Sequence, residues 1–158
     1  MKIEFSYFKY LSRLYFIHFC GIIAVGLGFY YGLEFVLSTI YLVIIFFEIK
    51  NLPVKSFLHN AAYYFSWQGL ALFCSFLLIG AHSGNFFIDN AVFILQYWST
   101  PIYPWMTLFS NAGGAYAFSY YALISWPWVS VPVFFGIVYR NKIISAFNMI
   151  VKKITIFP

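Results

Sequence analysis

Four acidic residues and three histidines are the side chains that could carry acid–base or metal chemistry in this sequence. The acidic residues are Glu4, Glu34, Glu48 and Asp89. Each falls at the end of an apolar run or between two runs, so no carboxylate is expected in the middle of a membrane span. A pump driven by protons or cations needs an ionisable group at membrane depth. The positions of the acids therefore argue against that class of protein.

The histidines are His18, His59 and His82. Haem ligation by two histidines requires imidazoles at similar depth, and only His18 and His59 are expected near the same side of a membrane. Their spacing is not typical of a metal site, in which His and Cys recur at short fixed intervals. We predict no metal and no cofactor. We expect histidines that bond to backbone or lipid headgroups near the membrane surface, with a ligand role as the alternative.

No familiar catalytic arrangement occurs in the chain. There is no Ser-His-Asp pattern, no pair of carboxylates, no P-loop and no dinucleotide fingerprint. Cys20 and Cys74 do not form a CxxC pair, and both fall inside apolar runs, where small packing residues are expected. We therefore predict a protein that is not an enzyme, with no catalytic residues.

Polar side chains within the apolar run 61–81 are a further candidate. Gln68 lies one turn after Tyr64, with Ser66 between them. Amides and phenols could bind a quinone carbonyl or a substrate hydroxyl in an apolar cavity. Such groups more often join neighbouring membrane helices, and we favour that role for Gln68.

Two pairs of glycines have the GxxxG spacing, which lets a second helix approach closely. The pairs are Gly28 with Gly32 and Gly80 with Gly84. Together with Gln68 they are the predicted helix-packing residues.

An aromatic stretch broken by prolines is the most distinctive feature of the chain. Prolines 101 and 104 interrupt a run that is otherwise apolar enough to cross a membrane. The surrounding polar and aromatic side chains are the candidate partner-binding residues, namely Gln96, Tyr97, Trp98, Tyr103 and Trp105. Rigid aromatics beside prolines offer contact area with little loss of entropy on binding. The alternative is that they belong to the interfacial aromatic belt.

Composition defines the class of protein that positions these residues. The chain has 158 residues, of which 63% are hydrophobic and 25% aromatic, while only 8% are charged. Soluble domains have charged residues near a quarter of the total. We predict an all-α integral membrane protein with a single membrane domain, 1–158. Its net charge of +5 is spread over three flanks, which does not indicate nucleic-acid binding.

The apolar runs predict four transmembrane helices, which are 14–32, 35–49, 61–81 and 115–139. An amphipathic flank at 1–13 and another at 142–158 predict helices on the membrane surface. Segment 84–114 is predicted to be a proline-broken element on the outer side, re-entrant or lying at the interface. The alternative has a fifth span at 91–109.

The distribution of charge favours four spans. All nine lysines and arginines lie outside residues 56–139. With four spans they share one face, as the positive-inside rule prefers. Both termini are then on the cytoplasmic or matrix side, and the expected location is a bacterial inner membrane, with the mitochondrial inner membrane as the alternative.

These features predict a non-catalytic subunit or accessory protein of a larger membrane complex, such as respiratory or secretion machinery. Its expected partners are the lipid bilayer and other membrane protein subunits, without nucleic acid. One alternative is an immunity or exclusion protein that binds a membrane-acting partner. The other is a carrier for a lipid or another hydrophobic molecule.

Overall fold

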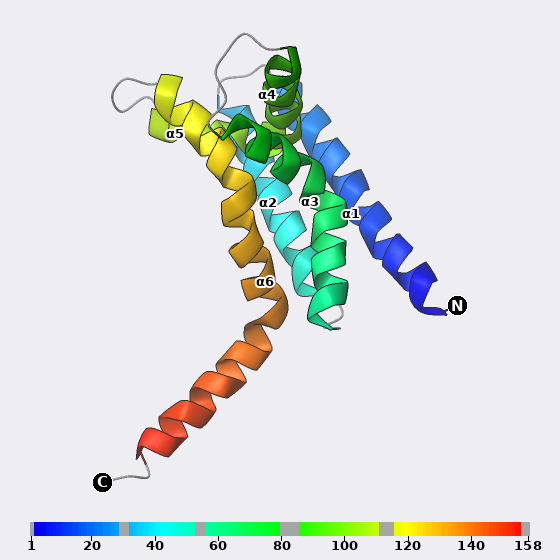
Figure 1. Cartoon of the computed structure of the whole chain (residues 1–158), viewed down its shortest axis with the longest axis vertical. Helices are drawn as coiled ribbons and strands as arrows, with labels where there is room; N and C mark the ends of the chain where they lie inside the picture. The colour runs from blue at the N-terminus through cyan, green and yellow to red at the C-terminus, as the bar shows by residue number, and fades with distance from the viewer. Residues whose placement is uncertain (1, 29–31, 53–55, 80–85, 111–115, 156–158) are drawn as a thin grey trace.

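The computed structural model describes residues 2–28, 32–52, 56–79, 86–110 and 116–155. Figure 1 shows an all-helical fold, with no strand in those ranges. Its elements in chain order are α1 (Lys2–Gly26), α2 (Leu33–Lys50), α3 (Phe57–Leu78), α4 (Phe86–Ser99), the 3₁₀ turn η1 (Thr100–Ile102), α5 (Tyr103–Ser110) and α6 (Tyr116–Thr155). The predicted all-α class is confirmed for the described residues.

Three helices in the described part of the chain are long and apolar enough to cross a membrane. The segments are Tyr7–Gly26 of α1, Phe57–Leu78 in α3 and Tyr120–Arg140 of α6. The chain is therefore an α-helical membrane protein. Helix α2 also has 18 residues, but it carries Glu34, Glu48 and Lys50 near its two ends.

Two helices are longer than the sequence predicted. Helix α1 is continuous from Lys2 to Gly26 where a surface helix and a separate span were expected, and α6 continues through Arg140 to Thr155. Neither predicted junction contains a glycine or proline, so nothing in the local sequence ends the helix there. Figure 1 shows the last part of α6 extending away from the other helices.

Helices α1 and α2 form an antiparallel hairpin. Gly32 precedes α2 with φ of 89°, a left-handed conformation that glycine adopts without a steric penalty. Along the hairpin, Gly21 faces the ring of Tyr41, and a Cβ built at Gly21 would lie 2.5 Å from that ring. The Arg13 guanidinium pairs with the Glu48 carboxylate near the other end. Close packing of the hairpin thus depends on Gly21.

Side chains of α3 bond to carbonyls of α6 near its two prolines. Pro127 and Pro132 lie inside α6, and each removes a backbone N–H from the helix. The Tyr64 hydroxyl donates to the carbonyl of Pro127 at 3.0 Å, and the Ser75 hydroxyl donates to the carbonyl of Ile124 at 2.5 Å. These two bonds join α3 to the part of α6 that contains the prolines.

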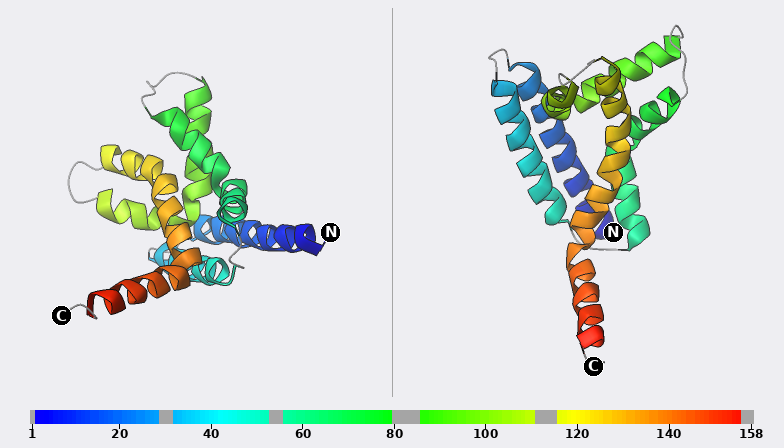
Figure 2. Two further views of the ribbon diagram at one scale, coloured as in Figure 1. Left: turned by 60° about the horizontal axis from the view of Figure 1, so that its bottom comes forward. Right: turned by 90° about the vertical axis from the view of Figure 1, so that its left-hand side faces the viewer.

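The segment α4–η1–α5 packs between the α1–α2 hairpin and the α3–α6 pair. Its helices lie at the end of the helical body where α1 ends and α2 begins, as the right-hand view in Figure 2 shows. The Ser38 hydroxyl of α2 donates to the carbonyl of Pro101 in η1, and both residues are buried. The proline-broken turn is therefore held by α2.

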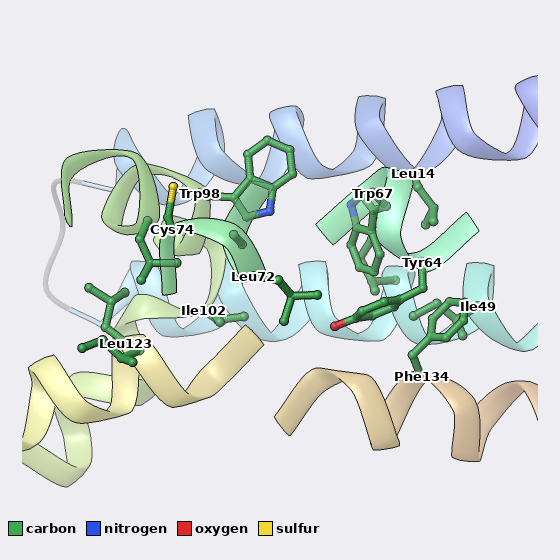
Figure 3. Packing of buried hydrophobic residues seen from close by; sticks show 14 of the residues in the cluster. Leu14, Ile49, Tyr64, Trp67, Leu72, Cys74, Trp98, Ile102, Leu123 and Phe134 are labelled. Carbon is green, nitrogen blue, oxygen red and sulfur yellow. The ribbon is translucent and has the colours of Figure 1, made fainter. Parts of the chain in front are cut away.

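The core lies where α1, α2, α3 and α6 meet beneath η1. Figure 3 shows Leu14, Trp67, Tyr64 and Phe134 in its right half, and Trp98 further left, on the same side as Ile102 of η1. The Tyr64 and Phe134 rings are 4.9 Å apart at their centroids. Aromatic side chains contribute much of the buried area because each covers more surface than an aliphatic residue.

Candidate functional site

Buried polar side chains from four elements meet in the core. The imidazole Nδ1 of His18 lies 2.7 Å from the Tyr41 hydroxyl, and the indole Nε1 of Trp98 donates to Oε1 of Gln68 at 3.1 Å. The rings of His18 and Trp98 are 4.3 Å apart at their centroids. Trp67 stands edge-on to His18 on the other side, with the ring centroids 6.1 Å apart. We call these five residues the polar cluster.

The polar cluster lies deep within the helical body. At a rise of about 1.5 Å per residue, His18 is about 12 Å from the end of α1 at Gly26. Gln68 is likewise about 15 Å from the end of α3 at Leu78. Half of a typical hydrocarbon core is about 15 Å. The cluster is therefore near the middle of the candidate spans Tyr7–Gly26 and Phe57–Leu78, and the C-terminal end of α4 brings Trp98 to it.

A cavity of about 210 Å³ lies beside the polar cluster. All five residues of the cluster line one side of it. The rest of the lining is mainly apolar and includes Ile45 and Ile49 of α2 and Val133, Phe134 and Ile137 of α6, but α6 also contributes the polar side chain of Ser130. We call this space the interior cavity. Protein interiors contain few voids larger than a water molecule, so a space of this size is a candidate ligand site.

Two buried nitrogens of the polar cluster have no hydrogen-bond partner within the described part of the chain. They are Nε2 of His18 and Nε1 of Trp67. The Trp98 backbone is near the imidazole but not in hydrogen-bonding geometry with Nε2. Buried polar atoms are almost always bonded to protein or ordered water, and an unpaired one costs about 1–3 kcal/mol. Both nitrogens are enclosed by surrounding protein atoms, so the fold carries the cost of burying them.

A second hollow, of about 610 Å³, lies between the start of α2 and the α4–η1–α5 segment. Polar and aromatic side chains line it, including Glu34, Gln96, Tyr97 and Tyr103. We call it the outer groove. Glu34 is in the first turn of α2, where the helix dipole stabilises a negative charge. Among the residues described, Glu34 has no ion-pair partner.

The predicted partner-binding residues separate into three environments. Gln96, Tyr97 and Tyr103 line the outer groove, where the two tyrosines are 50% and 39% exposed. Trp105 is 37% exposed, packs edge-on against the Phe35 ring and borders a different hollow.

Trp98 belongs to the core, where it is only 8% exposed. Its indole N–H is bonded to Gln68, so the side chain is directed inward rather than toward a free surface. The docking hypothesis therefore concerns the groove residues and not Trp98.

The predicted helix-packing residues also lie in different places. Gln68 contacts Trp98, at the junction of α3 and α4. Gly28 lies after the end of α1, and Gly32 is the residue before α2. Both are therefore in the connection and not in a helix–helix interface. The glycine that admits a close neighbour is Gly21, which faces Tyr41. Gly80 and Gly84 lie outside the described residues.

The three histidines do not assemble into one site. The His59 ring packs edge-on against Tyr7, with centroids 5.3 Å apart, whereas the His18 ring contacts the aromatic residues of the polar cluster. His82 lies outside the described residues. No group of three or more His, Cys, Asp or Glu side chains that could hold a metal occurs in the described ranges.

Sequence reasoning missed His18, Tyr41 and Trp67 as neighbours of Gln68. Two weak signals were present in the apolar run 35–49, where Ser38 and Tyr41 lie three apart and so share a helix face. Both of their hydroxyls bond to other elements, Ser38 to η1 and Tyr41 to α1. Polar residues at helical spacing inside an apolar run could have indicated the buried face of α2.

No protein-family model matches the sequence, and no similar curated protein or solved structure was found. Function must therefore be argued from the sites themselves.

Proposed function

We propose that the chain crosses the membrane four times, through α1, α2, α3 and α6, with α4–η1–α5 as a re-entrant segment. Helices α1 and α3 run in the same direction along the helical body. Because α2 connects them in the sequence, α2 must cross back in the opposite direction. Helix α2 has 18 residues, a rise of about 27 Å, which is close to the ~30 Å thickness of a hydrocarbon core.

The positions of the charged side chains support the same topology. Lys50 is in the last turn of α2, where Arg13 pairs with Glu48, and Arg140 ends the candidate span of α6. Glu34 is in the first turn of α2, at the opposite end of that helix, and Asp89 is in the first turn of α4. The positive-inside rule assigns the basic end to the cytoplasmic or matrix side. We propose that both termini are on that side and that the outer groove opens on the opposite face.

We further propose that the protein is a non-catalytic subunit or accessory protein that docks a partner membrane protein in the outer groove. The observation that carries this proposal is the grouping of Glu34 with Gln96, Tyr97 and Tyr103 around one hollow. An aromatic belt alone would not require a carboxylate beside the tyrosines. The groove therefore has the chemistry of a binding surface.

The chemistry of the groove defines the partner segment that would fit. A carboxylate attracts a Lys or Arg side chain, and tyrosine faces attract the same cation at a distance within about 6 Å. Tyrosines also supply buried contact area at low entropic cost. The partner is therefore expected to present a basic side chain next to an apolar surface on the outer side of the membrane.

The test uses a photo-reactive amino acid at Tyr97 of the full chain in native membranes. A crosslink to one membrane protein at position 97, with none at Tyr121, supports docking in the groove. Tyr121 is the matched control because it is 68% exposed on α6 and does not line the groove.

Charge exchange then tests the contact directly. Glu34→Lys is expected to reduce the crosslink, and replacing the partner's basic residue by glutamate should restore it. Equal crosslinking at positions 97 and 121 would contradict docking in the groove. If the captured partner is a toxin or an invading machine, the immunity or exclusion alternative is favoured over a subunit role.

A further inference from the structure

We propose that a groove between α2 and α6 binds an anionic phospholipid, with one acyl chain in the groove and the phosphate group beside Lys50 and Arg140. This proposal does not depend on docking in the outer groove. Three observations support it. Two hollows adjoin between these helices, their open side faces hydrocarbon, and two basic side chains lie at one end.

The groove consists of the interior cavity and a neighbouring hollow of about 260 Å³. Leu42, Ile102 and Trp126 line both spaces, so the two adjoin. On α6 the lining extends from Ala122 to Ile137, a length of about 22 Å at the rise of an α-helix. One leaflet contributes about 15 Å to a hydrocarbon core, so an acyl chain fits along this length. We call the two spaces together the α2–α6 groove.

The open side of the α2–α6 groove faces lipid. Val129 and Val133 of α6 line it and are 49% and 51% exposed. Both lie within the candidate span Tyr120–Arg140, so their surroundings are hydrocarbon. An empty space there would forfeit contacts for the atoms that line it, and a neighbouring acyl chain can supply those contacts. The second chain of the same lipid can stay in the bilayer because the groove is open on this side.

Three hydroxyl groups in the lining are bonded within the protein and do not require a polar ligand. The Ser130 hydroxyl donates to the carbonyl of Pro127 at 2.8 Å, and the Tyr64 hydroxyl lies 2.5 Å from Oγ of Ser130. The Ser125 hydroxyl donates to the carbonyl of Ala122 at 3.2 Å. The part of the ligand that lies in the groove is therefore expected to be apolar.

Two basic residues follow the lining at one end of the groove. Ile49 of α2 lines it, and Lys50 is the next residue. On α6, Arg140 comes seven residues after Val133, or nearly two turns, so these two residues share a helix face. The C-terminal end of α2 lies beside the middle of α6 (Figures 1 and 2). Within the described ranges, neither Lys50 nor Arg140 forms an ion pair.

These two cations set the chemistry of the headgroup. Arg140 ends the candidate span of α6, and Lys50 is in the last turn of α2, so both are at the depth of lipid phosphates. A guanidinium binds phosphate through two hydrogen bonds and an ammonium binds it as a point charge. Basic pockets between membrane helices bind anionic headgroups in this way. A zwitterionic lipid would bring its own cation close to these two, so an anionic lipid is favoured.

The test uses phosphatidylglycerol with a photo-reactive diazirine in one acyl chain, added to the purified full chain in detergent. After irradiation, mass spectrometry locates the labelled residues. We expect labelling at or next to Val129 that added phosphatidylglycerol suppresses. Phosphatidylcholine should need at least a tenfold higher concentration for the same effect, because two cations favour the anionic headgroup.

Variants at the basic end test the headgroup contact. Lys50→Gln/Arg140→Gln should remove the preference for phosphatidylglycerol and retain suppression by both lipids at high concentration. Lys9→Gln is the control, because Lys9 is an exposed cation of α1 that does not line the groove. It should keep the tenfold preference.

A variant at the open side tests the position of the chain. Val133→Trp narrows the groove at an exposed residue and should reduce labelling near Val129 at least tenfold. Val36→Trp is its control, because Val36 is 54% exposed on α2 and does not line the groove; labelling should be unchanged. If Val133→Trp folds poorly, the charge variants still decide the assignment.

Three results would overturn the proposal. Labelling that no added lipid suppresses would mean general contact with the surrounding lipid and no site. Equal suppression by the two phospholipids in the unmodified chain would contradict recognition of an anionic headgroup. Suppression by oleate at a lower concentration than phosphatidylglycerol would overturn the assignment in favour of a free fatty acid.

Discussion

The bond between Trp98 and Gln68 should be measurable as a coupling energy between α4 and α3. Gln68→Leu removes the acceptor and leaves the Trp98 N–H buried without a partner, since the two groups lie 3.1 Å apart in the core. Leaving a buried donor unpaired costs about 1–3 kcal/mol. Trp98→Phe similarly leaves the Gln68 carbonyl oxygen unpaired and also removes part of a large buried side chain.

The double variant Gln68→Leu/Trp98→Phe replaces both partners by apolar groups, which is much less costly than losing one of them. Its loss of stability should therefore be smaller than the sum of the two single losses. Interhelical hydrogen bonds in membrane proteins give coupling energies of about 0.6 kcal/mol on average and up to about 1.7 kcal/mol. We expect a value toward the upper end because both residues are buried.

Reversible unfolding of the full chain in mixed detergent micelles, titrated with a denaturing detergent, gives the four free energies of unfolding. The matched control pairs Gln68→Leu with Trp128→Phe, because Trp128 bonds to Ser75 and not to Gln68. The control pair should be additive within about 0.5 kcal/mol. If the losses of stability in the Gln68/Trp98 pair are additive as well, the conclusion that this bond holds the C-terminal end of α4 in the core is refuted.

Two further substitutions test the contacts between helices by the same unfolding measurement. Gly21→Ala should destabilise the chain by about 1–3 kcal/mol, because its Cβ would lie 2.5 Å from the Tyr41 ring. Gly69→Ala is its control and should be neutral or stabilising by up to about 1 kcal/mol, since nothing lies within 4 Å of a Cβ there. A larger loss of stability in Gly69→Ala than in Gly21→Ala would contradict the packing of the hairpin. Ser75→Ala should cost about 0.6–1.7 kcal/mol because it removes the bonds to Ile124 and Trp128. An equal cost for Ser125→Ala, whose hydroxyl bonds within its own helix, would argue against a role for Ser75 in joining α3 and α6.

Composition and hydrophobic runs were sufficient to predict an all-α membrane protein and the approximate positions of its helices. Helix ends were less predictable where no glycine or proline marked them, as at Arg140 within α6. The GxxxG spacing at Gly28 and Gly32 did not indicate a helix interface, because α1 ends at Gly26. Spacing along the sequence cannot show where a helix ends.

The polar cluster could be predicted only in part. An amide in an apolar run singled out Gln68, but its partner Trp98 comes from a segment that the sequence suggested to be on the outer surface. Whether an aromatic side chain faces lipid, water or core depends on the path of the chain between distant elements. His18 was expected to bond to backbone or headgroups near the membrane surface, with a ligand role as the alternative. It is instead buried against Tyr41 and Trp67, which only the tertiary fold brings to it.

The proposed topology is tested most directly by labelling single cysteines with a membrane-impermeant maleimide in intact cells and in opened membranes. The background chain carries Cys20→Ser and Cys74→Ala, and the labelled positions are Asp89→Cys, Thr107→Cys and Asn51→Cys. With four spans and a re-entrant segment, positions 89 and 107 should react from the same outer face, and position 51 only after the membranes are opened. Labelling of position 107 together with position 51, and apart from position 89, would mean that 91–109 crosses the membrane, and would contradict the proposed topology.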